Sequence, residues 1–253
     1  MNTAVERAIT CMWQRYSEPL SLTDIARSAI LSRFHFSRVF KDATGVSPGQ
    51  FLSAVRIHQA KRMLLATSAS VADVSSAVGY SSLGSFTNRF TDSVGLSPSR
   101  FRRTEGTERV TPRRGPSTLE GQLAGTLGFP AGYASALIYL GVFDTPIVQR
   151  RPRAAGVFSL HSSLPFTYRL GMVPAGTWFV HALAAADSTD PQPWDHRESL
   201  VCAAGPVVVT PGDRTLVTLA LRPRQPTDLP VLLTLPELDA ERSGPVLRKA
   251  SLR

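Results

Sequence analysis

Few side chains of this chain are spaced for catalysis, and arginine carries most of its positive charge. Of 28 Lys and Arg residues, only 3 are lysine. Cys11 and Cys202 are too far apart to indicate a disulfide framework or a metal site. After residue 106 there is no nucleophile elbow, zinc-protease motif, phosphate loop or paired Cys/His cluster. The residue types therefore favour recognition of an acidic partner over catalysis, and we expect no enzyme activity.

Two groups of side chains in the second half could bind a ligand if the fold gathered them. Three scattered histidines would have to converge to hold a metal: His161, His181 and His196. Four aromatic side chains could line a pocket: Tyr168, Trp178, Phe179 and Trp194. Core positions are the favoured interpretation of the aromatic residues. We expect no metal and no other cofactor.

The positive charge is concentrated in the first part of the chain. The net charge is +9 and the pI about 10.4. Residues 1–105 contain 13 Lys and Arg against 7 Asp and Glu, whereas residues 119–239 contain 8 Arg against 10 acidic residues. Such an imbalance is typical of a nucleic-acid-binding region. A generally basic, arginine-rich surface is the alternative.

A sequence repeat organises this basic part. FSRVFKDATGVSPGQF (36–51) aligns with FTNRFTDSVGLSPSRF (86–101), and the upstream LTDIARSAI aligns with VADVSSAVG after a one-residue slip in the turn. Each copy predicts a short helix, a turn and a second helix, which is the helix-turn-helix plan. Apolar spacing, serine caps and glycine stops predict helices at about 3–17, 22–30, 33–44, 48–67, 71–78, 82–94 and 98–103.

The helix predicted at about 48–67 joins the two copies. About 20 residues span roughly 30 Å, close to the 34 Å or so of one turn of B-DNA. The chain could therefore place two reading helices in successive major grooves on one face of a duplex. A plain helical bundle is the alternative.

The composition changes after residue 105. Residues 106–118 are polar and rich in Pro and Gly, as in a linker, and residues 119–239 alternate short Val/Leu/Phe/Tyr runs with turns, as in a β-sandwich. Residues 240–253 form a basic tail. The predicted fold is thus multidomain, an all-α part with seven helices at residues 1–105 followed by an all-β sandwich. The segment Tyr168–Val180 loosely resembles the strand–turn–strand of transthyretin-like and carboxypeptidase regulatory-like domains.

The first part resembles the DNA-binding domain of AraC/XylS-family bacterial transcription regulators. The resemblance covers about residues 5–103 and rests on RVFKDATGVSPGQF, RIHQAKRMLL and AVGYSSLGSFTNRFTDSVGLSPSRFR. It implies a seven-helix domain with two helix-turn-helices, promoter binding, and RNA polymerase as a further partner. Most regulators of that family carry a ligand-sensing or dimerising domain in front of the DNA-binding domain. In this chain the order is reversed.

The resemblance also implies which residues face DNA. In the first unit they are Arg33, Phe34, Ser37 and Arg38. Arg38 is the best candidate for a paired contact with guanine, Ser37 could contact a base or phosphate, and Phe34 a thymine methyl group, unless Phe34 borders the core. We expect His35 to lie towards the packed side.

In the second unit the corresponding face is Leu83, Gly84, Ser85, Asn88 and Arg89. Asn88 could address adenine. Leu83 and Gly84 offer few hydrogen bonds, so we expect this reader to be weaker in direct readout or to depend on backbone contacts. Six further basic residues are candidate phosphate contacts, each of which could equally be a solvated surface charge: Arg56, Lys61, Arg62, Arg100, Arg102 and Arg103.

The leading hypothesis is a sequence-specific transcription regulator that binds double-stranded promoter DNA and senses a small molecule or self-associates through its sandwich. An architectural DNA-binding protein is one alternative, and an enzyme tethered to DNA is another. The N-terminal segment lacks the pattern of a signal peptide, and no apolar run approaches the roughly 18 residues of a membrane span. We therefore expect a cytoplasmic protein at the bacterial nucleoid.

Overall fold

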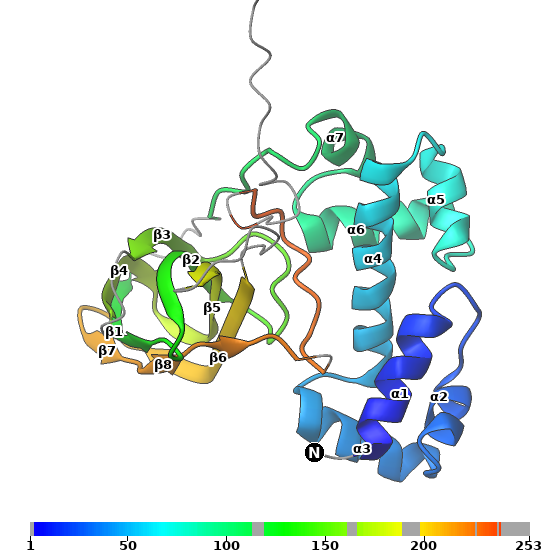
Figure 1. Cartoon of the computed structure of the whole chain (residues 1–253), viewed down its shortest axis with the longest axis horizontal. Coiled ribbons are helices and arrows are strands. Elements are labelled where there is room, and N and C mark those ends of the chain that lie inside the picture. The colour runs from blue at the N-terminus through cyan, green and yellow to red at the C-terminus, as the bar shows by residue number, and fades with distance from the viewer. Residues whose placement is uncertain are drawn as a thin grey trace, which may run out of the picture.

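The computed structural model describes residues 3–112, 119–160, 166–188, 198–225, 227–236 and 238. Helices come first and strands follow (Figure 1). The helices are α1 (Thr3–Gln14), α2 (Leu22–Ser28), α3 (Arg33–Thr44), α4 (Pro48–Ala66), α5 (Val71–Ala77), α6 (Leu83–Val94) and α7 (Pro98–Arg103). The strands are β1 (Glu120–Gly128), β2 (Tyr133–Phe143), β3 (Ala154–Leu160), β4 (Phe166–Pro174), β5 (Gly176–Ser188), β6 (Glu198–Val209), β7 (Arg214–Leu216), β8 (Leu219–Ala220) and β9 (Arg222–Pro223).

Local sequence signals fix the helix ends. Serine side chains cap the first turns of α2 to α7, and three of these caps are reciprocal capping boxes: Ser21 with Asp24, Ser47 with Gln50, and Ser70 with Asp73. Such a cap stabilises a helix by about 1 kcal/mol. The two glycines that end α3 and α6 adopt left-handed φ values of 76° and 86°, which glycine reaches without steric cost. The predicted helix ends are confirmed to within two residues, except that the first helix ends at Gln14 and not near Ser17.

Repeated phenylalanines form the core of each helical unit. Phe36 and Phe40 in α3, and Phe86 and Phe90 in α6, are fully buried. The ring centres of the first pair lie 5.3 Å apart and those of the second pair 5.6 Å apart. The two copies of the sequence repeat therefore build two equivalent cores.

Helix α4 connects these two cores. In Figure 1 it runs vertically, with α1, α2 and α3 around its lower end and α5, α6 and α7 around its upper end. Its 19 residues give a length of about 28 Å. The helical part is thus two small bundles held on one long helix, as the sequence predicted.

The region after residue 119 is β-rich and mostly antiparallel. One sheet has the order β4-β1-β7, with β8 also paired to β1, and the other has the order β3-β2-β5-β6-β9. Apolar side chains of both sheets share one core cluster. The turn at Pro174–Gly176 passes from β4 in the first sheet to β5 in the second, rather than forming a hairpin within one sheet.

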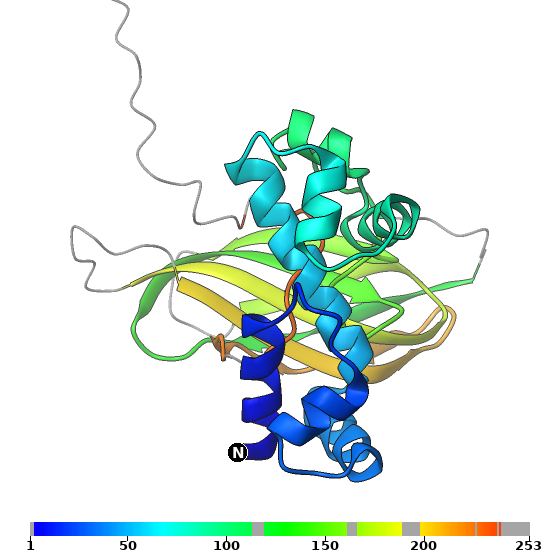
Figure 2. The same cartoon turned by 90° about the vertical axis from the view of Figure 1, so that its right-hand side faces the viewer.

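The helical part and the β region pack against each other. The outer face of the five-stranded sheet and the segment 229–235 share a hydrophobic cluster with the helices, and that segment runs alongside α4 in Figures 1 and 2. Val110 lies in the predicted linker yet belongs to the same cluster. Residues 113–118 and the predicted basic tail lie outside the described residues.

Candidate DNA-binding interface

The pairs α2–α3 and α5–α6 each have helix-turn-helix form, but their turns differ. The first turn, residues 29–32, contains Ile30 at a φ of 59°. The second turn, residues 78–82, is one residue longer and has Gly79 at a φ of 86°. A β-branched residue is strained in this conformation, whereas glycine is not. The one-residue slip predicted from the repeat is therefore located in the turn.

The beginning of α3 forms an exposed, basic end. Arg33 and Arg38 are exposed, Ser37 is half-buried, and Phe34 is 76% exposed rather than bordering the core. The guanidinium carbon of Arg33 lies 4.7 Å from the centre of the Phe34 ring, within cation–π range. The structure thus brings the four predicted base-reading residues of the first unit to one helix end.

His35 corrects an expectation. We expected it to lie towards the packed side of α3, but it is exposed. Its backbone amide donates to the Ser32 hydroxyl at 3.4 Å, and its ring forms no hydrogen bond with a described residue. In the helix, Phe36 and Phe40 fill the inward stripe and turn position 35 away from it. His35 thus joins the exposed end, where the sequence reasoning missed it.

The beginning of α6 is exposed but offers fewer polar groups. Leu83 is 47% exposed, and a Cβ added at Gly84 would meet nothing within 4 Å. The Ser85 hydroxyl accepts a hydrogen bond from the Ser82 hydroxyl at 2.9 Å. Asn88 is exposed. Of these four residues, Asn88 has the largest exposed side chain that can form hydrogen bonds.

Arg89 lies apart from the other predicted readers of α6. It is half-buried, and its Nε donates to the Ser53 hydroxyl of α4 at 2.9 Å. In the repeat it corresponds to Val39, which packs against the helical core. The structure therefore places this guanidinium against α4, whereas Asn88 beside it stays exposed.

Two of the six candidate phosphate contacts tie helix ends together. Arg56 donates from Nε to the Tyr16 carbonyl at 2.8 Å and from a terminal nitrogen to the Glu18 carbonyl at 2.7 Å. Burial lowers the pKa of the Arg56 guanidinium. Arg102 donates in the same way to the carbonyls of Leu64, within α4, and Ala69, beyond its end. Both side chains act inside the helical part.

The other four candidates divide between paired and exposed side chains. Lys61 donates to the Leu233 carbonyl of the β region at 3.3 Å. Arg100 forms a doubly hydrogen-bonded pair with Glu108, at 2.6 and 2.8 Å. Arg62 and Arg103 are exposed, and the structure shows no bond from either to a described residue. Arg62 and Arg103 are therefore the candidate phosphate contacts whose charged groups are not bonded to a described residue.

The turn between α1 and α2 is where the two helical units meet. It accepts the two hydrogen bonds of Arg56, and a Cβ added at Gly79 would lie 2.8 Å from the Ser17 carbonyl oxygen. Next to it, the Tyr80 hydroxyl lies 3.4 Å from that of Ser53, the partner of Arg89. We call Tyr16–Glu18, Ser53, Arg56, Gly79, Tyr80 and Arg89 the inter-unit joint. It fixes the second unit relative to the first.

The β region contacts the far ends of both α3 and α6. Pro146 lies 3.7 Å from the position that a Cβ on Gly45 would take, at the end of α3. The Arg150 amide donates to the Ser93 carbonyl near the end of α6 at 2.9 Å. Residues 144–153, between β2 and β3, thus span both units and leave the beginnings of α3 and α6 exposed.

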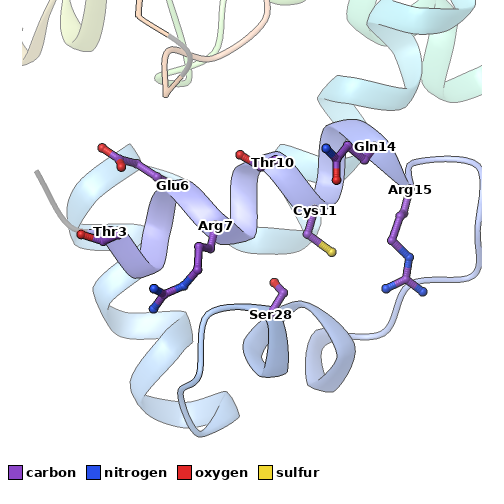
Figure 3. Close-up of a pocket in the computed structure, with 8 residues that line it drawn as sticks. All are labelled: Thr3, Glu6, Arg7, Thr10, Cys11, Gln14, Arg15 and Ser28. Atoms are coloured by element: carbon purple, nitrogen blue, oxygen red, sulfur yellow. The ribbon is translucent and has the colours of Figure 1, made fainter.

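A polar depression of about 440 Å³ lies between α1 and α2 (Figure 3). Its arginines are already engaged: Arg7 donates to the Ala29 carbonyl at 3.2 Å, and Arg15 pairs with Glu18 at 2.6 Å. This pairing raises the pKa of Arg15 and lowers that of Glu18. The Cys11 side chain points towards Ser28 in Figure 3. The depression therefore offers no unpaired guanidinium.

Among the described residues, the ligand candidates of the β region are not gathered into one site. The side chain of Tyr168 is buried between the sheets and donates to the Val217 carbonyl, and Trp178 donates to the Pro174 carbonyl, both at 2.7 Å. Trp194, His161 and His196 lie outside the described residues. Within the described ranges no cluster of three metal-ligating side chains occurs. No helix among the described residues is both long and apolar enough to cross a membrane.

The known proteins that resemble this chain match its helical part. A family model described as a helix-turn-helix domain matches residues 25–104. The lactose operon transcription activator of Staphylococcus xylosus is 29% identical over 102 residues, which are 40% of this chain and 37% of that protein. The bifunctional transcriptional activator/DNA repair enzyme AdaA of Bacillus subtilis is 30% identical over 97 residues, which are 38% of this chain and 46% of that protein. The DNA repair in that name is an activity of AdaA.

Solved structures give a match of similar extent. A transcriptional regulator from Chromobacterium violaceum with an AraC-type DNA-binding domain is 28% identical, with a TM-score of 0.39, over 40% of this chain and 91% of that chain. The matched part spans less than half the length of each of these two curated relatives.

Proposed function

We propose that residues 25–104, which match a helix-turn-helix family model, are a DNA-binding domain of the AraC type, and that the chain binds promoter DNA sequence-specifically and regulates transcription. The beginnings of α3 and α6 would enter successive major grooves on one face of the duplex. In helix-turn-helix proteins, residues at the beginning of the second helix contact base edges.

The observation that carries this proposal is a pair of exposed helix ends on one stiff spacer. Helix α4 is about 28 Å long, and one turn of B-DNA is about 34 Å. The inter-unit joint and, while the β region is docked, residues 144–153 hold both units, so the docked chain has the spacing of the two ends set before DNA binds. A pre-set spacing removes an ordering cost from binding.

The exposed side chains suggest a division of roles. Arg38 would pair with guanine and Asn88 with adenine, while Ser37 would contact a base or phosphate and Phe34 a thymine methyl group. Arg62 and Arg103 would bind phosphates, because their charges are exposed and unengaged. Leu83 and Gly84 would let the second helix approach closely with little base discrimination.

The test is binding of Arg38→Ala to a duplex selected from a random pool by the full chain. Loss of one base-reading pair weakens specific binding by about 1–3 kcal/mol. Binding to random duplexes should change little. Arg103→Ala is the control, and it should weaken both duplexes equally. Equal losses for Arg38→Ala would make it a phosphate contact, and failure to select any sequence would favour an architectural DNA-binding protein.

For the β region we infer a β-sandwich that senses a small molecule or mediates self-association. The support is the core cluster shared by the two sheets and the packing of the outer sheet face on the helices. The chain would act at promoters with RNA polymerase as a further partner, in the bacterial cytoplasm.

A further inference from the structure

A cavity of about 360 Å³ lies between the helical part and the five-stranded sheet. Both parts line it: Val5 and Thr44 come from α1 and α3, Pro146 from the segment after β2, and His181 and Leu183 from β5. Small-molecule sites commonly have volumes of about 300–1,000 Å³. The cavity is therefore large enough for a compact organic molecule.

His181 faces the helical side of the sheet. Side chains alternate between the two faces of a strand. Val180 and Ala182 belong to the core between the sheets, whereas Leu183 belongs to the cluster shared with the helices. His181 has the same parity as Leu183, and both line the cavity. The imidazole thus belongs to the wall of the cavity.

The His181 ring has one unused hydrogen-bonding atom. The side chain lines the cavity but is buried, at 7% exposed. Nε2 has no partner among the described residues and is itself almost fully covered, so a bound donor reaches it through a turn of the ring towards the cavity. Burial lowers the pKa of His181 to about 4, so the ring is neutral at pH 7, and it forms a hydrogen bond with the Thr145 backbone. If the ring donates there, Nε2 is left as an acceptor. A buried polar atom without a partner costs about 1–3 kcal/mol, which a bound donor would offset.

The charges in the cavity wall are already paired. Among its described lining residues, Arg222 and Asp228 carry the formal charges, and they form two hydrogen bonds with each other at 2.5 and 2.8 Å. Val148, Leu183 and Val231 supply apolar wall. This chemistry suits a neutral molecule with an apolar body better than an ion.

We propose that this cavity binds a small, neutral, largely apolar molecule whose hydroxyl group donates a hydrogen bond to His181 Nε2, and that this binding controls the affinity for DNA. The control of DNA affinity rests on the proposed function above, whereas the binding site does not.

The coupling follows from which elements the cavity joins. A molecule that contacts both parts binds their docked arrangement better than a separated one, so it shifts the population towards docking. In the docked arrangement, Pro146 lies against the end of α3 and Arg150 is bonded to Ser93 near the end of α6. Docking therefore holds both reading helices in their spacing, and the ligand should strengthen DNA binding.

The site is tested by calorimetric titration of the full chain with a panel of neutral phenols and aliphatic alcohols of about six to twelve carbon atoms, each paired with its methyl ether. At least one hydroxyl compound should bind about tenfold more tightly than its ether, because the ether lacks the donor. His181→Leu should reduce its affinity to that of the ether. His181→Gln keeps an acceptor and should retain part of the difference. Absence of binding across the panel, or equal binding of compound and ether, overturns the site, and this comparison needs no variant.

The coupling is tested on a duplex selected by the full chain. Saturating hydroxyl compound should tighten DNA binding about tenfold, within the usual range of about 5- to 150-fold for coupled sites. The same compound should leave the DNA affinity of His181→Leu unchanged. Binding of the compound with no change in DNA affinity overturns the coupling. A chain that binds the compound but selects no DNA sequence refutes the proposed function and leaves the site intact.

Discussion

The two helix-turn-helix units share a core and differ in how their second helices use polar side chains. Phe36 and Phe40 in α3 match Phe86 and Phe90 in α6, and all four are fully buried. Yet α3 presents arginines to the surroundings, whereas the arginine of α6 is bonded to Ser53. The comparison supports the proposal that the first unit does most of the base reading, whereas the arginine of the second unit holds α6 against α4.

The two turns also differ in whether they pack against the other helical unit. Gly79 allows the second turn to pack against the Ser17 carbonyl, whereas Ile30 in the first turn is 77% exposed and packs against little. The joint between the units is therefore built on the turn of the second unit. The strained residue lies in the turn that makes no such contact.

Acid should affect the first unit most, since the cavity beside His181 is lined by the end of α3. Burial lowers the pKa of His181 to about 4, and burial with nearby Lys61, Arg224 and Arg62 lowers that of His58 to about 4. Both would titrate near 6.5 when unfolded. The unfolded state therefore binds more protons between pH 6.5 and 4, and stability falls across that window as pH falls.

The loss at pH 5 should be about 2 kcal/mol for each histidine, measured by urea unfolding. His181→Gln should remove about half of this pH dependence. Hydrogen exchange at pH 5 should show α3 losing protection before α6. Equal loss in both helices would contradict the closer dependence of the first unit on the β region.

Gly79→Ala should destabilise the chain by about 3 kcal/mol. The added Cβ costs about 1–2 kcal/mol in the left-handed conformation, and it would also lie 2.8 Å from the Ser17 carbonyl oxygen. Thermal unfolding measures the loss. Gly84→Ala is the matched control, because its Cβ meets nothing within 4 Å on a helix, and it should stabilise by up to about 1 kcal/mol. Similar losses for both would remove the close approach as the cause.

Arg89→Ala and Asn88→Ala should separate holding from reading within α6. Arg89→Ala should lower the free energy of unfolding by about 1 kcal/mol through the lost bond to Ser53. It should leave the selected DNA sequence unchanged. Asn88→Ala should relax the selection at one base pair with little effect on stability. A changed sequence preference in Arg89→Ala would restore it as a base reader.

Ile30→Gly should raise the free energy of unfolding by about 0.5–1 kcal/mol. It relieves the left-handed strain of a β-branched residue that buries little surface. Ile30→Ala is the control, because it shortens the side chain but retains the Cβ that causes the strain. If alanine stabilises as much as glycine, then the exposed apolar surface, and not the backbone, distinguishes the two turns.

Local signals allowed the sequence to predict the helical part closely. Caps and glycine stops act over three or four residues, and the repeated phenylalanines mark the inward stripe directly. The exposed end of α3 followed from that stripe. His35 did not, because it lies between Phe34, which is exposed, and Phe36, which is buried, and the local pattern does not show which neighbour it follows.

Long-range partners of basic side chains could not be predicted. Arg56 reaches carbonyls 38 and 40 residues away, Arg102 reaches 33 and 38 residues, and Lys61 reaches 172 residues. Nothing in the local pattern around an arginine distinguishes a carbonyl that folding brings near from a phosphate. The same limit applies to the cavity, because its walls come from elements at both ends of the chain.

The segment 229–235 has a consequence for how the protein is made. Leu232, Leu233 and Leu235 complete the hydrophobic cluster over α4, although they follow it by well over a hundred residues. Translation adds about 5–20 residues per second, so the helices can fold many seconds before these leucines leave the ribosome. During that interval the nascent chain carries formed reading helices and an uncovered apolar strip, and a chaperone that shields the strip would raise the yield of finished protein.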